Sequence, residues 1–251
     1  MAYDWTVGVV TSSGGLFLAH ATGLSAARIA MLGSGDTSDL LTWSGTPFHM
    51  ARALAPHAME IRHAGALASG GHHRLDRAKQ FWRRLRGIRF APLHTDQDAL
   101  ALAESANRKI AELAPDVVFV AGGSSVLARL RTKKPVVYTS DTTARLMFDY
   151  HPSFADLSRR VRNQQHELEQ AAIDRADLLL YPTRWAARSA TEHYGANEAK
   201  IVVAPYGANL SVLPSRESVL KRDTNNTCEL LFVATNWPLK GGPIALDAAW
   251  T

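Results

Sequence analysis

Short apolar runs alternate along this chain with longer stretches in which apolar residues recur every three or four positions. The apolar runs predict β-strands, and several are continuous, which is typical of strands buried on both faces of a parallel sheet. The predicted strands cover residues 29–32, 59–63, 117–120, 136–139, 178–181, 201–204 and 230–233. The longer stretches predict helices over residues 47–56, 75–86, 98–113, 155–175, 184–194 and 244–249. This alternation predicts an α/β fold with a doubly wound, Rossmann-like parallel sheet.

Several predicted helix ends carry recognisable capping residues. Thr46 is a capping residue followed by Pro47 at the first helical position, and Thr183 can cap the helix that follows it. Pro115 and Gly195 fall just past helix ends.

The chain divides by composition into a large domain and the start of a second one. The polar stretch 214–227 is the clearest linker. A strand, turn and helix follow it and cannot bury their apolar face alone, so we expect the second domain to be incomplete in this chain. The predicted parts are an uncertain extension over 1–26, a domain over 27–213, a linker over 214–228 and the second domain over 229–251.

The first 26 residues do not resemble a secretory signal, because no Lys or Arg precedes their apolar part. We expect a loose extension or an early translation start. The single cysteine, Cys228, favours a reducing compartment, and no apolar run reaches the roughly 20 residues that span a bilayer. These features predict a cytoplasmic protein.

The net charge of +5 is local. Residues 74–89 hold seven basic residues and one acidic residue, whereas the remainder holds 21 basic and 22 acidic residues. Apolar and aromatic side chains recur in this segment at helical spacing. The segment is expected to be an outer helix with a solvated arginine face, and peripheral contact with the inner face of a membrane remains an open alternative. The sequence shows no further cluster of basic and aromatic residues, so nucleic-acid binding is not predicted.

Ligands of doubly wound folds bind at the carboxyl ends of the strands, so the residues after each strand are candidates for a site. Gly33 and Gly35 admit a dinucleotide interpretation, but Ser38 stands at the third glycine position. Free N–H groups at Ser44-Gly45-Thr46 could hold a hydroxyl or a phosphate, or the segment could simply cap a helix. The other candidates are Ser140-Asp141-Thr142, Pro182-Thr183-Arg184-Trp185 and Pro205-Tyr206-Gly207-Ala208-Asn209.

A second candidate lies near the end of the chain. Lys240, Gly241 and Gly242 lead from a turn into a predicted helix, and a lysine with backbone N–H groups at a helix start can bind a diphosphate. The alternative is a solvated lysine beside a turn. His72 and His73 have no carboxylate or cysteine at ligand spacing, so no metal site is predicted.

Four segments together resemble glycosyltransferase family 4, the retaining sugar transferases of the two-domain GT-B fold. They are DLLTWSGTPFHMARAL at 39–54, ELEQAAIDRADLLLYPTRWAARS at 167–189, HYGANEAKIVVAPYGAN at 193–209 and LFVATNWPLKGGPIALDAA at 231–249. They resemble, in order, the first-helix signature of one branch, the acidic helix with its following strand, the crossover into the linker, and the opening of the nucleotide-sugar domain.

The resemblance implies that the amino-terminal domain binds the acceptor and the carboxy-terminal domain binds a nucleotide-sugar donor, with no other cofactor. Lys240 matches the family lysine on the donor diphosphate, with Gly241 and Gly242 beside it. The acceptor could be a lipid, a glycan or a small molecule. The implied acceptor-side residues are Gly33, Gly35, Ser44, Gly45, Thr46, Arg184 and Trp185.

The chain departs from the family pattern at three points. Thr235 stands where an arginine is usual, and Asp141 stands where a histidine often lines the sugar site. Asp141 could orient a sugar hydroxyl at the catalytic centre, or it could cap a helix over 142–149. The paired glutamates that hold the donor belong to the second domain and are missing, so we expect little or no transfer by the 251 residues alone. The alternatives are a non-catalytic remnant or binding module, and a dinucleotide-binding oxidoreductase domain.

Overall fold

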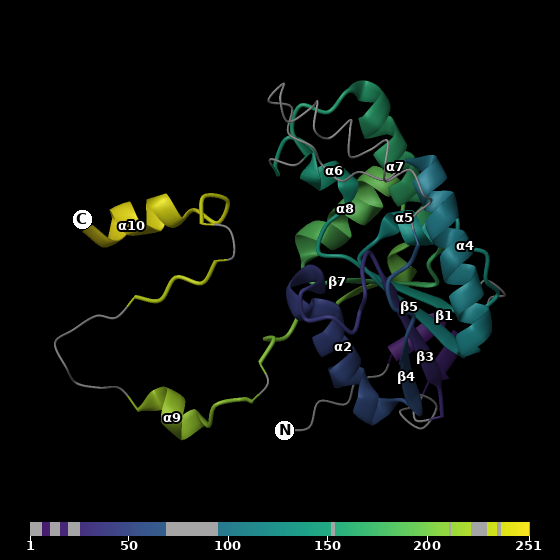
Figure 1. Cartoon of the computed structure of the whole chain (residues 1–251), viewed down its shortest axis with the longest axis horizontal. Coiled ribbons are helices and arrows are strands. Elements are labelled where there is room, and N and C mark those ends of the chain that lie inside the picture. The colour runs from purple at the N-terminus through teal and green to yellow at the C-terminus, as the bar shows by residue number, and fades with distance from the viewer. Residues whose placement is uncertain are drawn as a thin grey trace. The chain divides into compact units, whose positions relative to one another are not determined.

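The computed structural model describes residues 7–10, 16–19, 26–68, 95–151, 154–210, 212–221, 230–234 and 237–250. The chain forms two compact units, residues 1–209 and residues 210–251, and each is described by itself (Figure 1). The basic segment 74–89, the predicted helix 75–86, His72, His73 and Thr235 lie outside the described residues.

The first unit is built on a six-stranded, all-parallel sheet with the order β4-β3-β5-β6-β7-β8. The strands are β3 (Arg28–Gly33), β4 (Glu60–His63), β5 (Val117–Ala121), β6 (Val136–Thr139), β7 (Leu178–Tyr181) and β8 (Ile201–Val203). The order reverses between β3 and β5, where doubly wound folds place their ligand crevice. The predicted sheet is therefore confirmed, and each of these strands lies within one residue of its predicted bounds.

Helices cover both faces of this sheet. One face carries α4 (Asp96–Leu113), α5 (Ser124–Leu127), α7 (Arg159–Arg175) and α8 (Arg184–Tyr194). The other face carries α2 (Thr46–Leu54), which begins after the 3-10 turn η1 (Thr42–Gly45) and continues into η2 (Ala55–His57). The shorter elements α6 (Ala144–Met147) and η4 (Glu198–Lys200) lie in the connections.

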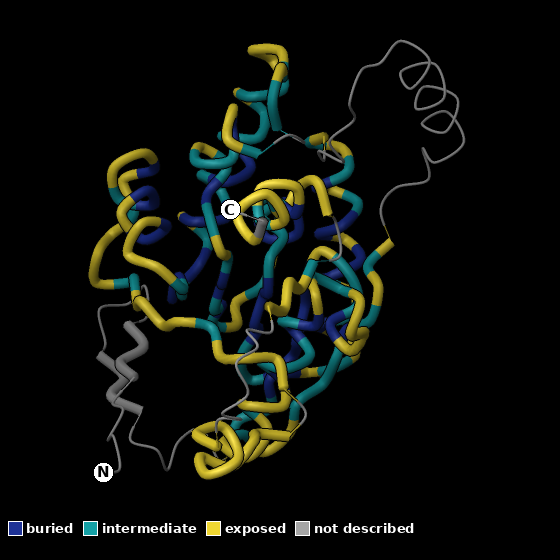
Figure 2. The backbone as a smooth tube through the Cα atoms, turned by 90° about the vertical axis from the view of Figure 1, so that its left-hand side faces the viewer, coloured by how far each residue is buried: buried dark blue, intermediate teal, exposed yellow. Residues whose placement is uncertain are grey.

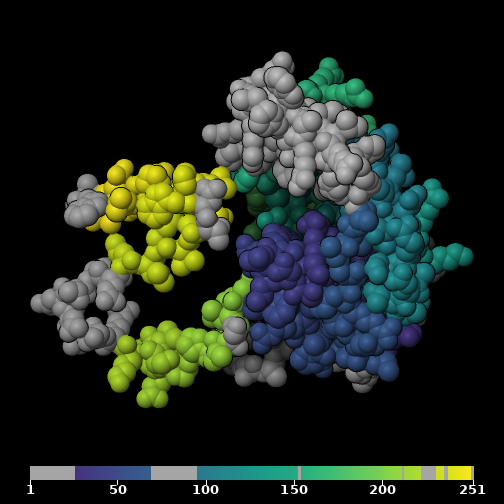
Figure 3. Space-filling view, in the orientation of Figure 1, coloured from purple at the N-terminus to yellow at the C-terminus, as the bar shows by residue number. Residues whose placement is uncertain are grey.

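The apolar core follows the central strands. Figure 2 shows buried residues in the middle of the tube and exposed residues along its outer turns. In the space-filling view, residues 26–68 and α4 form neighbouring parts of one face (Figure 3). Continuous apolar strands and helices with alanines on their inner side let the layers approach closely, as in α8, where Ala186 and Ala190 are fully buried.

Two predicted caps are confirmed and one is corrected. The Thr183 hydroxyl accepts the N–H of Ala186, and Gly195 ends α8 at a φ of 62°. Thr46, however, is the first residue of α2, and the capping position is Gly45 at a φ of 75°. Glycine is needed there because the chain leaves η1 in the left-handed region.

One predicted helix start and one predicted strand are wrong. The helix predicted over 155–175 begins at Arg159, because Ser158 accepts the N–H of Val161 and starts the helix there. Residues 230–233 form no strand in the described part of the chain, and Leu230 and Leu231 are exposed. An isolated apolar run cannot become a strand without a hydrogen-bonded neighbour.

Two further features were not predicted. Within residues 1–26, β1 (Val7–Val10) and β2 (Leu16–Ala19) pair as an antiparallel hairpin. In the second unit, the polar stretch contains the helix α9 (Arg216–Leu220), which Ser215 caps. That unit ends in α10 (Gly242–Trp250), close to the predicted helix over 244–249. Among the helices that the structure describes, none is both long and apolar enough to cross a membrane.

The core packing can be tested with a matched pair of leucine variants. Leu179 of β7 is fully buried, whereas Leu41 is 87% exposed. Leu179→Ala should lower the free energy of unfolding by about 2–5 kcal/mol because it leaves a cavity, and Leu41→Ala should change it by less than about 0.5 kcal/mol. Urea unfolding followed by far-UV circular dichroism measures both, and equal effects would contradict this placement of the core.

Candidate functional site

The turns after β3 and β5 lie against each other at the carboxyl edge of the sheet. A Cβ added at Gly33 would come within 2.8 Å of the carbonyl oxygen of Ala121, and one added at Gly123 would come within 3.1 Å of the amide nitrogen of Ser34. Gly35 faces Thr42 in the same way, at 3.0 Å from its hydroxyl. The glycines at these turns thus allow two backbones to approach beside the point where the strand order reverses.

The predicted segment Ser44-Gly45-Thr46 belongs to an unusual turn. Trp43, Ser44 and Gly45 have φ values of 45°, 54° and 75°, so two non-glycine residues adopt the left-handed region. That conformation costs each of them roughly 1–2 kcal/mol. Such strain persists only where surrounding contacts hold it.

The loop after β8 supplies those contacts. The rings of Trp43 and Tyr206 meet edge to face at 5.8 Å, and the side-chain amide of Asn209 donates to the carbonyl oxygen of Ser44 at 3.1 Å and to the hydroxyl of Thr46 at 3.5 Å. We call this contact the clasp, consisting of Trp43, Ser44, Thr46, Tyr206 and Asn209. Residues more than 160 positions apart in the sequence therefore share one surface.

The clasp is joined to the end of β6. The hydroxyls of Tyr206 and Thr139 hydrogen-bond at 3.0 Å, and burial raises the pKa of Tyr206 to about 12. The following residue, Ser140, donates its hydroxyl to the carbonyl oxygen of Thr142 at 2.8 Å. Asp141 between them is exposed, and the capping position of α6 is Thr143. Asp141 is therefore not the cap of the following helix.

Arg184 and Trp185 are the first two residues of α8, after β7. Arg184 is exposed, and Trp185 is half exposed with its ring 6.1 Å from that of Tyr150. The described structure thus places the predicted residues of β3, β6 and β7 at one edge of the sheet. It adds Trp43 and brings it together with the candidates Tyr206 and Asn209, a contact that was not predicted.

A buried acid lies beneath this edge. Glu169 of α7 is only 4% exposed, and the hydroxyl of Ser124, the first residue of α5, lowers its pKa slightly. Its Oε1 and the hydroxyl of Tyr181 have no hydrogen-bond partner among the described residues. Burial, with a smaller contribution from the charge of Asp141, raises the pKa of Glu169 to about 7. The sequence did not predict this site, because nothing in the local pattern of a polar helix shows that one of its acidic residues is buried.

The predicted donor residues belong to the second unit. Lys240 is exposed and lies in the turn that leads into α10. The N–H of Gly241 donates to Pro238 at 3.2 Å, and that of Gly242 donates to Trp237 at 2.9 Å. The Trp237 indole occupies the space that a Cβ at Gly242 would need. The position before the helix is as predicted, but both glycine N–H groups are used within the turn. The diphosphate role stays a prediction.

Residues 48–212 match the family model described as Glycosyltransferase Family 4. The chain belongs to glycosyltransferase family 4. The matched residues run from α2 to the loop after β8 and include the clasp residues Tyr206 and Asn209.

Two curated relatives of this family 4 chain carry the name D-inositol 3-phosphate glycosyltransferase. The protein from Nocardiopsis dassonvillei is 32% identical over 135 residues, which cover 52% of this chain and 31% of the relative. The protein from Geodermatophilus obscurus is 28% identical over 135 residues, which cover 52% of this chain and 29% of the relative. The matched stretch therefore spans about three tenths of the length of these relatives.

The loop after β3 also separates this family 4 chain from dinucleotide-binding oxidoreductases. In the dinucleotide motif the third glycine lies inside the helix that binds the pyrophosphate. Here Ser38 lies in a turn, where its N–H and hydroxyl donate to Asp36 at 2.9 and 2.6 Å, and α2 begins only at Thr46. The glycines Gly33 and Gly35 allow close packing here, and their acceptor-side role stays a prediction.

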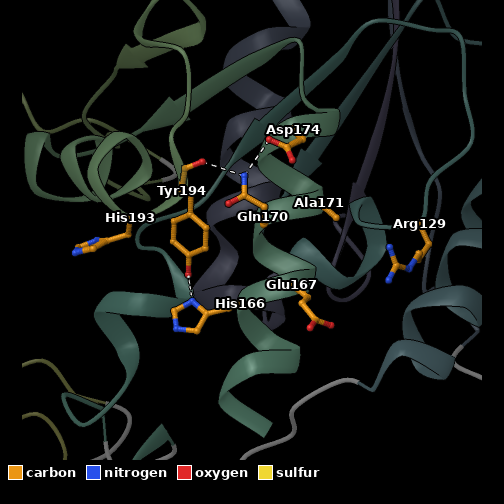
Figure 4. Close-up of a pocket in the computed structure, with 8 residues that line it drawn as sticks. All are labelled: Arg129, His166, Glu167, Gln170, Ala171, Asp174, His193 and Tyr194. Carbon is orange, nitrogen blue, oxygen red and sulfur yellow. Dashed lines mark hydrogen bonds between the residues drawn. The ribbon is translucent and has the colours of Figure 1, made fainter. Parts of the chain in front are cut away.

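One open pocket of about 470 Å³ lies away from the predicted residues, between α7 and α8 (Figure 4). It is lined by Arg129, His166, Glu167, Gln170, Ala171, Asp174, His193 and Tyr194. Within the described ranges, no group of three or more His, Cys, Asp and Glu side chains is arranged to hold a metal ion.

The raised pKa of Glu169 predicts a pH dependence of stability. The folded state holds the proton up to about pH 7, whereas the unfolded chain releases it near 4.5. The free energy of unfolding should therefore fall as the pH rises through this window, by up to ~3 kcal/mol at about 1.4 kcal/mol per pKa unit. Glu169→Gln should remove this fall.

Urea unfolding at pH 5 and pH 8 measures the difference. Glu167→Gln is the matched control, because Glu167 is an exposed glutamate on the same helix. An unchanged pH dependence in Glu169→Gln would contradict the assignment.

Proposed function

We propose that this chain forms the acceptor side of a retaining glycosyltransferase and carries the turn that contacts the diphosphate of a nucleotide-sugar donor. The observation that carries the proposal is the clasp in a family 4 chain. It holds a strained turn at the carboxyl edge of the sheet, where folds of this kind bind their ligands. Strain held in this way is typical of functional sites.

The exposed side chains at this edge suit a polyol acceptor. The carboxylate of Asp141 can accept hydrogen bonds from hydroxyls, and the half-exposed Trp185 offers a flat apolar face to a ring. Arg145 and Arg184 are exposed cations at the starts of α6 and α8, the helices that follow β6 and β7, and arginine binds phosphate oxygens in pairs. We propose a phosphorylated polyol as the acceptor, in keeping with the name of the relatives.

On the donor side, negative charge develops on the departing nucleoside diphosphate during transfer. A fixed ammonium group placed there stabilises that charge more than it stabilises the bound donor. Lys240 is proposed for this role, and Gly241 and Gly242 let the turn bring it to the start of α10. A binding module that retained only the acceptor site would not need this lysine.

We also propose that the 251 residues alone transfer little sugar. The matched stretch covers only 31% and 29% of the relatives, and the glutamates that the family resemblance assigns to the donor sugar lie beyond the matched acceptor side. Transfer by this chain at rates near those of a full-length relative would contradict the proposal.

A cytoplasmic site of action is proposed from the single cysteine, and liposome co-sedimentation would test peripheral membrane contact through residues 74–89.

Replacing the donor lysine should weaken donor binding. Lys240→Ala removes the cation beside the diphosphate, so the affinity for a nucleotide sugar should fall about tenfold. Isothermal titration calorimetry with uridine- and guanosine-diphosphate sugars measures this, and Lys133→Ala at another exposed lysine is the control. Equal affinities in the two variants would remove Lys240 from the donor site.

The acceptor assignment has a separate test. Asp141→Asn keeps the size of the side chain but removes its charge, so binding of D-inositol 3-phosphate should weaken several-fold while donor binding stays the same. Asp174→Asn, at an exposed aspartate of α7, is the matched control. Binding of the phosphorylated and unphosphorylated polyol, measured by NMR titration, shows whether the phosphate is recognised. No effect of Asp141→Asn would assign the acceptor to another surface.

A further inference from the structure

The loop that joins β6 to α6 is held from behind by two hydroxyl groups of α8. Thr143 and Ser189 share a hydrogen bond between their hydroxyls at 2.6 Å, and the backbone N–H of Arg145 donates to the hydroxyl of Tyr194 at 3.0 Å. Thr143, Ser189 and Tyr194 are all buried, at 1%, 2% and 5% exposure. These contacts fix the loop that carries Asp141 against the helical layer.

Each of the two hydroxyls leads on to a histidine. Nδ1 of His193 lies 2.8 Å from the Ser189 hydroxyl, and Nδ1 of His166 lies 2.9 Å from the Tyr194 hydroxyl. Both histidines line the open pocket between α7 and α8, and Figure 4 shows the contact between His166 and Tyr194. Each hydroxyl and its histidine form a short hydrogen-bonded chain, which we call a relay. Solvent in the pocket can therefore exchange protons with the histidine at the outer end of each relay.

We propose that Ser189 and Tyr194 are positioning residues for the β6–α6 loop, and that His193 and His166 set the direction in which their hydroxyls donate. The proposal rests on the proposed function, because the loop matters for transfer only if Asp141 contacts the acceptor.

The relay through Tyr194 has a defined proton arrangement. The N–H of Arg145 can only donate, so the Tyr194 oxygen accepts it. Neutral His166 accepts a hydrogen bond from the Tyr194 hydroxyl at Nδ1. The Arg145 N–H, the Tyr194 hydroxyl and Nδ1 of His166 then all have a partner. When His166 gains a proton, Nδ1 becomes a donor, and the Tyr194 hydrogen loses its acceptor inside a buried site. That mismatch weakens the hold on Arg145.

The relay through Ser189 reverses in the same way. With Nδ1 of His193 accepting, Thr143 donates to Ser189 and Ser189 donates to the histidine. A protonated His193 donates to Ser189 instead, so Ser189 donates to Thr143. The hydroxyl hydrogen of Thr143 must then find another acceptor in the loop. Protonation at the pocket thus changes which atoms of the loop are held.

The charges around His166 favour its neutral form at pH 7. Burial lowers its pKa first, and the positive groups of Arg145, His193 and Arg162 lower it further. Asp149 pairs with Arg162, and the Phe148 ring packs edge-on against the imidazole at 4.9 Å. The other charged or titratable groups near the pocket and its relays are Arg129, Glu167, Glu169, Asp174, Arg188 and Glu192. The loop should therefore be held at pH 7.5 and loosened at acidic pH, where His166 gains its proton.

Amide hydrogen exchange of the whole 15N-labelled chain tests the proposal without substrate. After correction for intrinsic rates, the Arg145 amide should exchange about fivefold faster at pH 5.5 than at pH 7.5, the factor that one hydrogen bond contributes. Tyr194→Phe should give the fast rate at both pH values, and Ser189→Ala, which removes the partner of the Thr143 hydroxyl, should speed exchange of the neighbouring Arg145 amide. His166→Asn retains an acceptor but cannot gain a proton, so it should keep Arg145 slow at both pH values.

Two matched controls separate positioning from general destabilisation. Tyr181→Phe removes another buried hydroxyl, and Ser105→Ala removes a hydroxyl that accepts the N–H of Ala68. Both should leave the exchange of Arg145 unchanged. Exchange in the wild-type chain that does not depend on pH, or Tyr194→Phe with wild-type rates, would overturn the proposal. If that occurs while Asp141→Asn still weakens acceptor binding, the proposed function stands and only the positioning role fails.

Discussion

The parallel pairing of the six strands is the constraint on which the candidate site depends. Parallel register places Gly33 beside Ala121 and Ala121 beside Thr139, so the loops after β3, β5 and β6 leave the sheet at one level. Distant segments therefore meet at this edge without any element of their own to join them. The contact between Asn209 and Ser44 follows from this register, because β8 ends at the same edge of the sheet.

Close approach at this edge requires glycine at some positions and tolerates strain at others. Gly33 and Gly123 are needed because a Cβ would collide with backbone atoms of the neighbouring turn. Trp43 and Ser44, in contrast, adopt the left-handed region although glycine would do so more easily. Glycine could not provide the Trp43 ring that packs against Tyr206. The strained turn is therefore the part of the candidate site that local stability does not explain, which is the observation behind the proposed function.

The sequence predicted the frame of the fold better than its site. Val136–Thr139 and Leu178–Tyr181 were predicted with their observed bounds because continuous apolar runs between turns leave little choice. Residues 230–233 show the limit of the same rule, because a strand also needs a partner that local pattern cannot supply. Gly45 as a cap, the contact of Tyr206 with Trp43 and the burial of Glu169 depend on distant residues, so no window of sequence reveals them.

The polar groups beneath the edge share one physical feature, which is their position between the helical layer and the loops. Glu169 is buried with an oxygen that lacks a partner in the described structure. The hydroxyls of Ser189 and Tyr194 hydrogen-bond the segment after β6. An apolar layer would be more stable, since an unsatisfied buried group costs about 1–3 kcal/mol. Hydrogen bonds, however, are directional, and apolar contacts are not. A layer that must hold exposed loops in one arrangement therefore gains accuracy from buried hydroxyls at the cost of stability, and a histidine stands at the outer end of each relay.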